Sequence, residues 1–136
     1  MPIFTQWHAS KQNVLLMKFA GTWELRDLEN AILKACDMAR QAKDAVYTIV
    51  FADGPVTFPP TFRLPQLAII TNNPKVQSNV KRTFIVAYSC HIRFMFNIYF
   101  RISPNHRDCI KVVDNFDEAL DAIEADKSLP SMAGAI

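Results

Sequence analysis

AVYTIVFAD, residues 45–53, is a nearly unbroken apolar run rich in β-branched and aromatic side chains. A strand that is covered on both faces, as in a parallel sheet, has this composition. KRTFIVAY (81–88) is a second run of the same type, and CIKVV (109–113) is a shorter one. At the N-terminus, IFTQWH (3–8) and VLLMKFA (14–20) flank the polar stretch SKQN, and this pattern predicts a β-hairpin.

Segments with helical spacing lie between these strands. In ELRDLENAILKACDMARQA (24–42) the apolar residues recur every three or four positions. A short helix is expected at about 62–70, after DGPVTFPPTF, whose prolines and glycine predict a loop. A third helix is expected within SCHIRFMFNIYFRI (89–102). A fourth should begin at Asn115, because Glu118 at the third helical position completes an N-terminal capping signal.

The predicted order of elements is β-β-α-β-α-β-α-β-α. Strands that alternate with helices imply right-handed crossovers and a mostly parallel sheet with flanking helices, in which the first strand is antiparallel. We therefore predict one α/β domain over residues 1–126. Residues 127–136 have no hydrophobic periodicity and are expected to form a flexible tail.

Composition excludes several classes of function. The 136 residues carry a net charge of +2, and the Lys and Arg residues are scattered. They form no basic stripe of the kind that would predict a nucleic-acid partner. No apolar run reaches the roughly 20 residues of a membrane span. The three cysteines show no metal-ligand spacing, and no glycine-rich phosphate loop can be built from three glycines. We expect a cytoplasmic protein without a metal or cofactor, in which no transmembrane segment is present and no enzymatic motif is found.

Four stretches carry a resemblance to a known family: FAGTWELRDLENAI, VYTIVFAD, RFMFNIYFRI and VVDNFDEALDAIEA. Together they resemble the SpoIIAA-like proteins, which are compact relatives of the STAS (anti-sigma-factor antagonist) and CRAL-TRIO lipid-binding folds. The resemblance covers roughly residues 3–125. It implies a four- or five-stranded sheet flanked by helices, in a family of mostly uncharacterised proteins rather than one with a known reaction.

In STAS regulators, a strand ends in an Asp that precedes a phosphorylated Ser at the start of the next helix. The matching strand here ends in Asp53, which the resemblance carries over as a switch candidate. Gly54 stands where the serine would be, and Thr57 is the nearest hydroxyl. The resemblance therefore does not transfer the phosphorylation switch to this chain. Asp53 equally fits a turn-forming residue whose side chain bonds local amides.

The carboxyl ends of parallel strands are where open α/β sheets bind ligands. Ser89, Cys90 and His91 follow one such strand end, and Asp114 follows another. A thiol at a helix N-terminus next to an imidazole suits nucleophilic chemistry. Adjacent helical residues point about 100° apart, however, so a packed helix start is the favoured interpretation.

A ligand site is a further hypothesis for the proline-rich loop. Phe58, Phe62 and Arg63 would suit a lipid or another small apolar molecule with an anionic end. The alternative is that these aromatic side chains cover the sheet.

The helix within 89–102 is more apolar than one sheet face requires. Arg93, Asn97 and Arg101 form a single narrow polar stripe, and the remaining interior positions are apolar. Its surplus apolar surface has three possible coverings: a second copy of the chain, neighbouring helices, or lipid. We favour the second copy, and the candidate interface residues are Phe94, Phe96, Tyr99 and Phe100. The sequence thus predicts a non-enzymatic interaction or regulatory module that forms a homodimer or binds another protein.

Overall fold

The computed structural model describes residues 3–42, 44–57, 63–71, 80–87, 90–102, 104 and 109–128, except for the side chains of 53–57, 64, 91 and 128. Its strands are β1 (Ile3–Trp7), β2 (Val14–Thr22), β3 (Val46–Thr57), β4 (Val80–Val86) and β5 (Ile110–Val113). Its helices are α1 (Leu25–Arg40), α2 (Leu64–Thr71), α3 (Cys90–Ile102) and α4 (Phe116–Ser128). This order confirms the predicted α/β succession.

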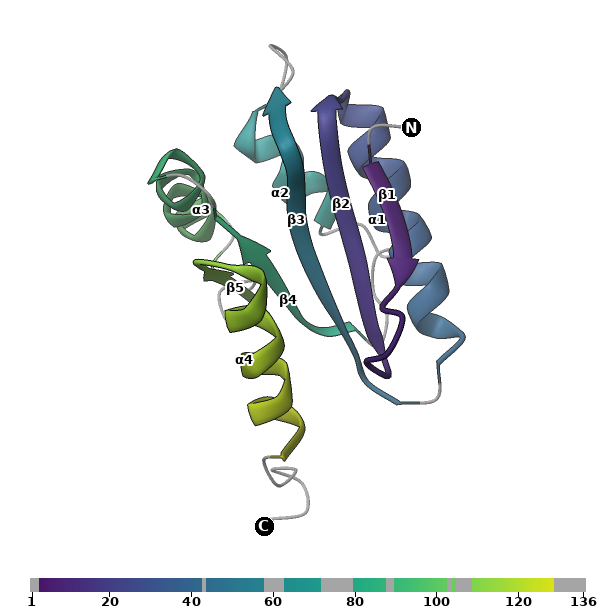
Figure 1. Ribbon diagram of the computed structural model, residues 1–136. Helices are drawn as coiled ribbons and strands as arrows, with labels where there is room; N and C mark the ends of the chain where they lie inside the picture. The colour runs from purple at the N-terminus through teal and green to yellow at the C-terminus, as the bar shows by residue number, and fades with distance from the viewer. Residues whose placement is uncertain are drawn as a thin grey trace.

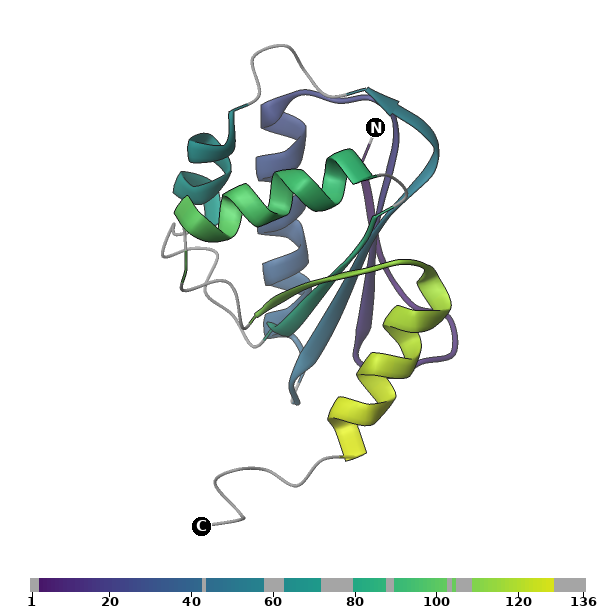
Figure 2. The same cartoon turned by 90° about the vertical axis from the view of Figure 1, so that its left-hand side faces the viewer.

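The five strands form one sheet in the order β1-β2-β3-β4-β5 (Figure 1). β1 pairs antiparallel with β2, and the other neighbours are parallel, as predicted. Because each parallel crossover is right-handed and moves one strand in the same direction, the three crossover helices fall on one face. Figure 2 shows α1, α2 and α3 together on that face and α4 on the other.

Alternation along the strands divides the interior into two cores. Leu15 and Met17 of β2 point toward α1, α2 and α3. Val14 of β2 and Ile49 of β3 point to the opposite face, where they pack with Ile123 of α4. The central strands are thus covered on both faces, which is why their sequences are almost continuously apolar.

The predicted end of the third strand was wrong. We expected the strand to end at Asp53 and a loop to begin there, but β3 continues through Thr57. β4 pairs with β3 only as far as Val50, whereas β2 follows it further, with Gly21 opposite Val56 after a register shift. The β4 side of this extension has no partner among the described residues, and an unpaired strand side is where proline is tolerated.

The termini of the helices follow local chemistry. At the start of α1, the Glu24 amide donates to the Asp27 carboxylate over 2.9 Å. At the start of α4, the Glu118 amide donates to Asn115 Oδ1 over 2.8 Å, which confirms Asn115 as the cap. α4 runs to Ser128, so the predicted boundary after residue 126 falls inside this helix. Residues 129–136, the rest of the predicted tail, lie outside the described residues.

Candidate functional site

The carboxyl-end edge of the sheet is only partly described. Phe58, Phe62 and Ser89 lie outside the described residues, as do the side chains of Asp53, Thr57 and His91. The ligand hypothesis for the proline-rich loop and the phosphorylation switch therefore stay predictions. Arg63 stands just before α2, where its amide donates to Gln66 Oε1 over 3.1 Å. This contact places Arg63 at the start of a helix.

Cys90 is the first residue of α3, and it is exposed. Its predicted partner His91 has no described side chain, so the structure does not test the thiol–imidazole pair. Among the side chains that the structure does describe, no group of three or more Cys, His, Asp or Glu is arranged to hold a metal ion.

Asp114 follows β5 at this edge and joins three elements. Its carboxylate forms an ion pair with the Arg93 guanidinium of α3. Its backbone amide donates to the Glu118 carboxylate of α4 over 2.9 Å. Arg93, on the polar stripe of α3, therefore ties this helix to the turn between β5 and α4. Asp114 acts here as a connector between helices.

The packing of α3 corrects one interface candidate. Tyr99 is fully buried (0% exposed), and its hydroxyl lies 2.7 Å from Thr71 Oγ1 of α2. Tyr99 therefore belongs to the chain's own core and not to an exposed surface. Phe96 and Phe100 are half-buried against the same core. α2 thus covers part of the surplus apolar surface of α3. A neighbouring helix was one of the three coverings considered for this surface.

Phe94 has a different environment from these aromatic residues. Its side chain is 63% exposed, and those of Ile69 on α2 and Ile102 on α3 are 71% and 43% exposed. We call these three residues the α2–α3 surface. The helices that carry them pack on each other. The only other large apolar side chains that are exposed in the described part of the chain are Phe4 and Trp7, on β1.

A cluster of charged and polar side chains around one buried carboxylate lies at the opposite, amino-end edge of the parallel strands. Asp126 of α4 is buried, with 9% of the residue exposed. Its carboxylate accepts a hydrogen bond from the Tyr47 hydroxyl of β3 and a second one, 2.9 Å long, from Arg82 Nε of β4. Lys81 Nζ of β4 lies 3.0 Å from the same carboxylate. One acidic side chain is therefore surrounded by two cations and a phenol.

These contacts shift the ionisation of the cluster. Burial raises the pKa of the Asp126 carboxyl, but the hydrogen bonds from Tyr47, Lys81 and Arg82 outweigh burial and lower this pKa to about 2. Burial and the adjacent Asp126 carboxylate raise the pKa of the Tyr47 hydroxyl. At neutral pH the carboxylate is charged and the phenol is protonated. This arrangement clamps the end of α4 to the start of β3 and β4.

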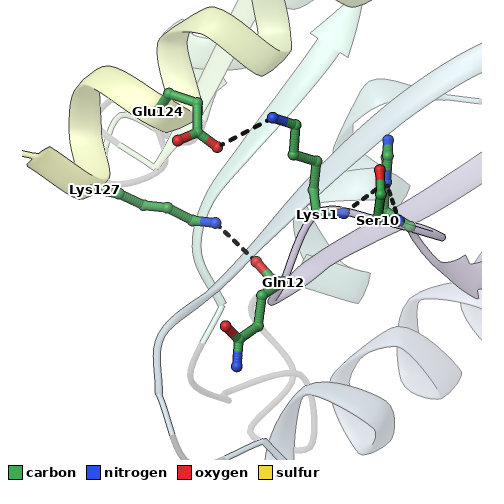
Figure 3. A network of polar contacts seen from close by, with 6 residues as sticks. Ser10, Lys11, Gln12, Glu124 and Lys127 are labelled. Atoms are coloured by element: carbon green, nitrogen blue, oxygen red, sulfur yellow. Dashed lines mark hydrogen bonds and ion pairs between the residues drawn. The ribbon is translucent and has the colours of Figure 1, made fainter.

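The turn between β1 and β2 is tied to the same helix (Figure 3). Lys11 Nζ lies 3.9 Å from the Glu124 carboxylate, and Lys127 Nζ donates to the Gln12 carbonyl over 2.8 Å. Within the turn, His8 Nδ1 accepts the amides of Ser10 and Lys11 over 3.1 and 3.0 Å. An open hollow of about 370 Å³ beside the turn is lined by residues that include His8 and Lys11.

Sequence reasoning missed the Asp126 cluster. The available signal was an acidic residue in the last turn of a helix, where the helix dipole disfavours negative charge. A Lys-Arg pair at the start of a buried strand was a second signal. Each residue alone looks like an ordinary charged surface residue, and only the tertiary contacts show that the charges compensate one another.

No protein-family model matches this chain, and no curated protein matches it. Among the described residues, no helix is long and apolar enough to cross a membrane.

Proposed function

We propose that the chain is a non-enzymatic interaction module that pairs with a second copy of itself through the α2–α3 surface. The exposure of Phe94 carries this proposal. A phenylalanine in the middle of a helix whose other aromatic residues pack inward leaves a large apolar area in water. Burial of a side chain of this size contributes about 1.5–3 kcal/mol.

A two-fold interface suits a small apolar surface. Each residue of such an interface occurs twice, so Phe94, Ile69 and Ile102 supply six apolar side chains to the contact. These side chains stand on two helices that pack on each other, and large exposed apolar patches usually mark contacts with other molecules. The resemblance to STAS regulators points in the same direction, toward protein interaction and away from a chemical reaction.

Lipid is the less favoured covering of this surface. Helices that lie on membranes carry a broad polar face rich in Lys and Arg. On α3 the cationic residues are Arg93 and Arg101, and Arg93 is paired with Asp114. The charge available on α3 to attract an anionic lipid surface is therefore small, whereas a second copy needs only apolar complementarity.

Sedimentation equilibrium of the purified chain over a wide micromolar range tests the proposal. We expect a monomer–dimer equilibrium that Phe94→Asp shifts at least about 100-fold toward the monomer, since two buried charges would enter each interface. Phe4→Asp is the matched control, because Phe4 is also exposed (45%) but lies on β1. A wild-type chain that stays monomeric throughout, or a dimer that tolerates Phe94→Asp, contradicts the proposal.

A further inference from the structure

The turn between β1 and β2 is organised around one imidazole ring. His8 Nδ1 accepts the backbone amides of Ser10 and Lys11 over 3.1 and 3.0 Å. Backbone amides are always donors, so Nδ1 must be the acceptor in both hydrogen bonds. A ring nitrogen that accepts a hydrogen bond carries no proton. The imidazole in this turn is therefore neutral, with its proton on Nε2.

Backbone hydrogen bonds fix the two ends of the turn. The His8 amide donates to the Val14 carbonyl over 2.8 Å, and the Tyr47 amide of β3 donates to the Asn13 carbonyl over 2.9 Å. Neither bond involves a side chain that takes up a proton in the ordinary pH range. The strand pairing at both ends is therefore independent of the charge on His8, and only the residues between the ends depend on it.

The middle of the turn is where the N-terminal hairpin contacts the last turns of α4 (Figure 3). Lys11 Nζ lies 3.9 Å from the Glu124 carboxylate. The Gln12 carbonyl accepts a hydrogen bond of 2.8 Å from Lys127 Nζ. Both contacts come from residues whose positions depend on the hydrogen bonds to the imidazole. The shape of the turn therefore determines whether it reaches α4.

Protonation of His8 is incompatible with this shape. An imidazolium carries a proton on each ring nitrogen, so Nδ1 would point an N–H group at the two amides that now donate to it. Ser10 and Lys11 would lose their acceptor, and the ring would have to turn away. Histidine is the side chain whose charge ordinarily changes between about pH 5 and pH 8. His8 also lines the open hollow beside the turn, so water can bring it a proton.

The charged groups around the turn are engaged with other partners. Glu124 of α4 faces Lys11 of the turn, and Lys127 of α4 faces the carbonyl of the turn. Among the described residues, no carboxylate forms an ion pair with the imidazole. The His8 ring stacks on Phe116 of α4 with the ring centres 6.4 Å apart, and either charge state can stack in this way. The two turn amides are therefore the groups that distinguish the neutral ring from the charged one.

We propose that His8 makes the β1–β2 turn a pH-sensitive switch that controls its contact with α4. The neutral ring fixes the amides of Ser10 and Lys11, and the turn then presents Lys11 and Gln12 to α4. When His8 takes up a proton, the two amides are released, the turn changes shape and both contacts with α4 are lost. This switch is separate from the α2–α3 surface, and its test does not depend on dimerisation.

NMR on the isotope-labelled full chain between pH 8 and pH 5 tests the switch. The ring signals of His8 report its charge, and amide protection factors, which correct for the intrinsic pH dependence of exchange, report the hydrogen bonds. We expect protection at Ser10 and Lys11 to fall at least about fivefold as His8 is protonated, because each amide loses its acceptor. The carbonyl carbon shift of Gln12 should change with the same midpoint. The His8 amide should keep its protection, since it bonds to the Val14 carbonyl.

Two substitutions at His8 separate the acceptor from the charge. His8→Asn keeps a side-chain acceptor, since asparagine side chains bond backbone amides two residues further on, but it removes the titrating group. This variant should protect the Ser10 amide equally at both ends of the pH range. His8→Ala removes the acceptor and should give low protection at every pH. Lys127→Met removes the donor on α4 and should give the low-pH carbonyl shift of Gln12 at every pH.

The outcomes that contradict the proposal are distinct. Equal protection of Ser10 and Lys11 before and after His8 is protonated would show that the turn does not respond to the charge. An equal pH response in His8→Asn would assign the response to another group and overturn the role of His8. A Gln12 carbonyl shift that does not follow the protonation of His8 would overturn the control of the α4 contact.

Discussion

The Tyr47 hydroxyl donates a hydrogen bond to the Asp126 carboxylate and joins residues that are 79 positions apart in the chain. Tyr47 lies near the start of β3 and Asp126 near the end of α4, so this contact closes the face of the sheet opposite α1. Lys81 and Arg82 complete the charge balance from β4. These contacts contribute to folding stability in a pH-dependent way, and the direction follows from the shifted pKa values of Asp126 and Tyr47.

The first prediction concerns the acid limb of stability. The pKa of Asp126 is lowered from 3.8 to about 2 in the folded chain. The ionised Asp126 carboxylate therefore contributes stability that is fully present above pH 4 and is lost as the pH falls toward 2. The contribution is about 2 kcal/mol. Asp126→Asn should lower the unfolding free energy by about this amount at neutral pH. It should also make the unfolding free energy less dependent on pH between 4 and 2.

Urea unfolding measured at intervals between pH 7 and pH 2 checks this expectation. Glu124→Gln is the control, because Glu124 lies on the same helix but is half-exposed and 3.9 Å from Lys11. Its effect should stay below about 0.5 kcal/mol. Equal effects of the two substitutions would show that Asp126 holds no special position.

The second prediction concerns the phenol itself. Tyr47→Phe removes the hydroxyl and leaves Asp126 with its two cations, so we expect a loss of about 1.5–3 kcal/mol for a hydrogen bond to a charged group. The pKa of Tyr47 is raised by burial and by Asp126, so its contribution is complete below pH 10 and is lost as the pH rises through the raised value. Unfolding curves above pH 10 should decline less steeply for Tyr47→Phe than for the wild-type chain.

The third prediction separates the core of α3 from its surface. Tyr99→Ala removes a fully buried aromatic ring and should destabilise the chain by about 3–5 kcal/mol. Tyr99→Phe keeps the buried ring and removes the hydroxyl that contacts Thr71 Oγ1, so it should cost about 1 kcal/mol. Phe94→Ala should change monomer stability by less than about 0.5 kcal/mol. Denaturant unfolding at a concentration where the chain is monomeric measures all three, and a large loss for Phe94→Ala would place Phe94 in the core.

The fourth prediction tests the bulge that lets β2 follow β3. Gly21 has a φ of +67°, and a Cβ atom at this position would meet no atom within 4 Å. Gly21→Ala should therefore destabilise the chain by about 1–2 kcal/mol through backbone strain alone. Gly21→Asn should cost less, because asparagine tolerates left-handed backbone. Thermal unfolding of the two variants provides the comparison, and a neutral Gly21→Ala would contradict the assigned conformation.

Local signals explain which features were predictable. The apolar runs at β3 and β4, the helical spacing of α1 and the cap formed by Asn115 and Glu118 involve neighbours in the chain, so the sequence alone determined the order of elements. The extension of β3 to Thr57 was not predictable in this way. Its glycine and proline favour a turn locally, but pairing with β2 through the shift near Gly21 overrides that preference.

Tertiary structure decided the surfaces. The helical wheel groups the residues of α3 by direction, but it does not state which direction meets α2; the contact between Tyr99 and Thr71 does. It also does not place Arg93 beside Asp114 or Tyr47 beside Asp126, because these partners are separated by 21 and 79 residues. The sequence determined what each segment is, since periodicity and capping are local. The fold determined which side chains remain exposed, since exposure depends on distant segments that pack over them.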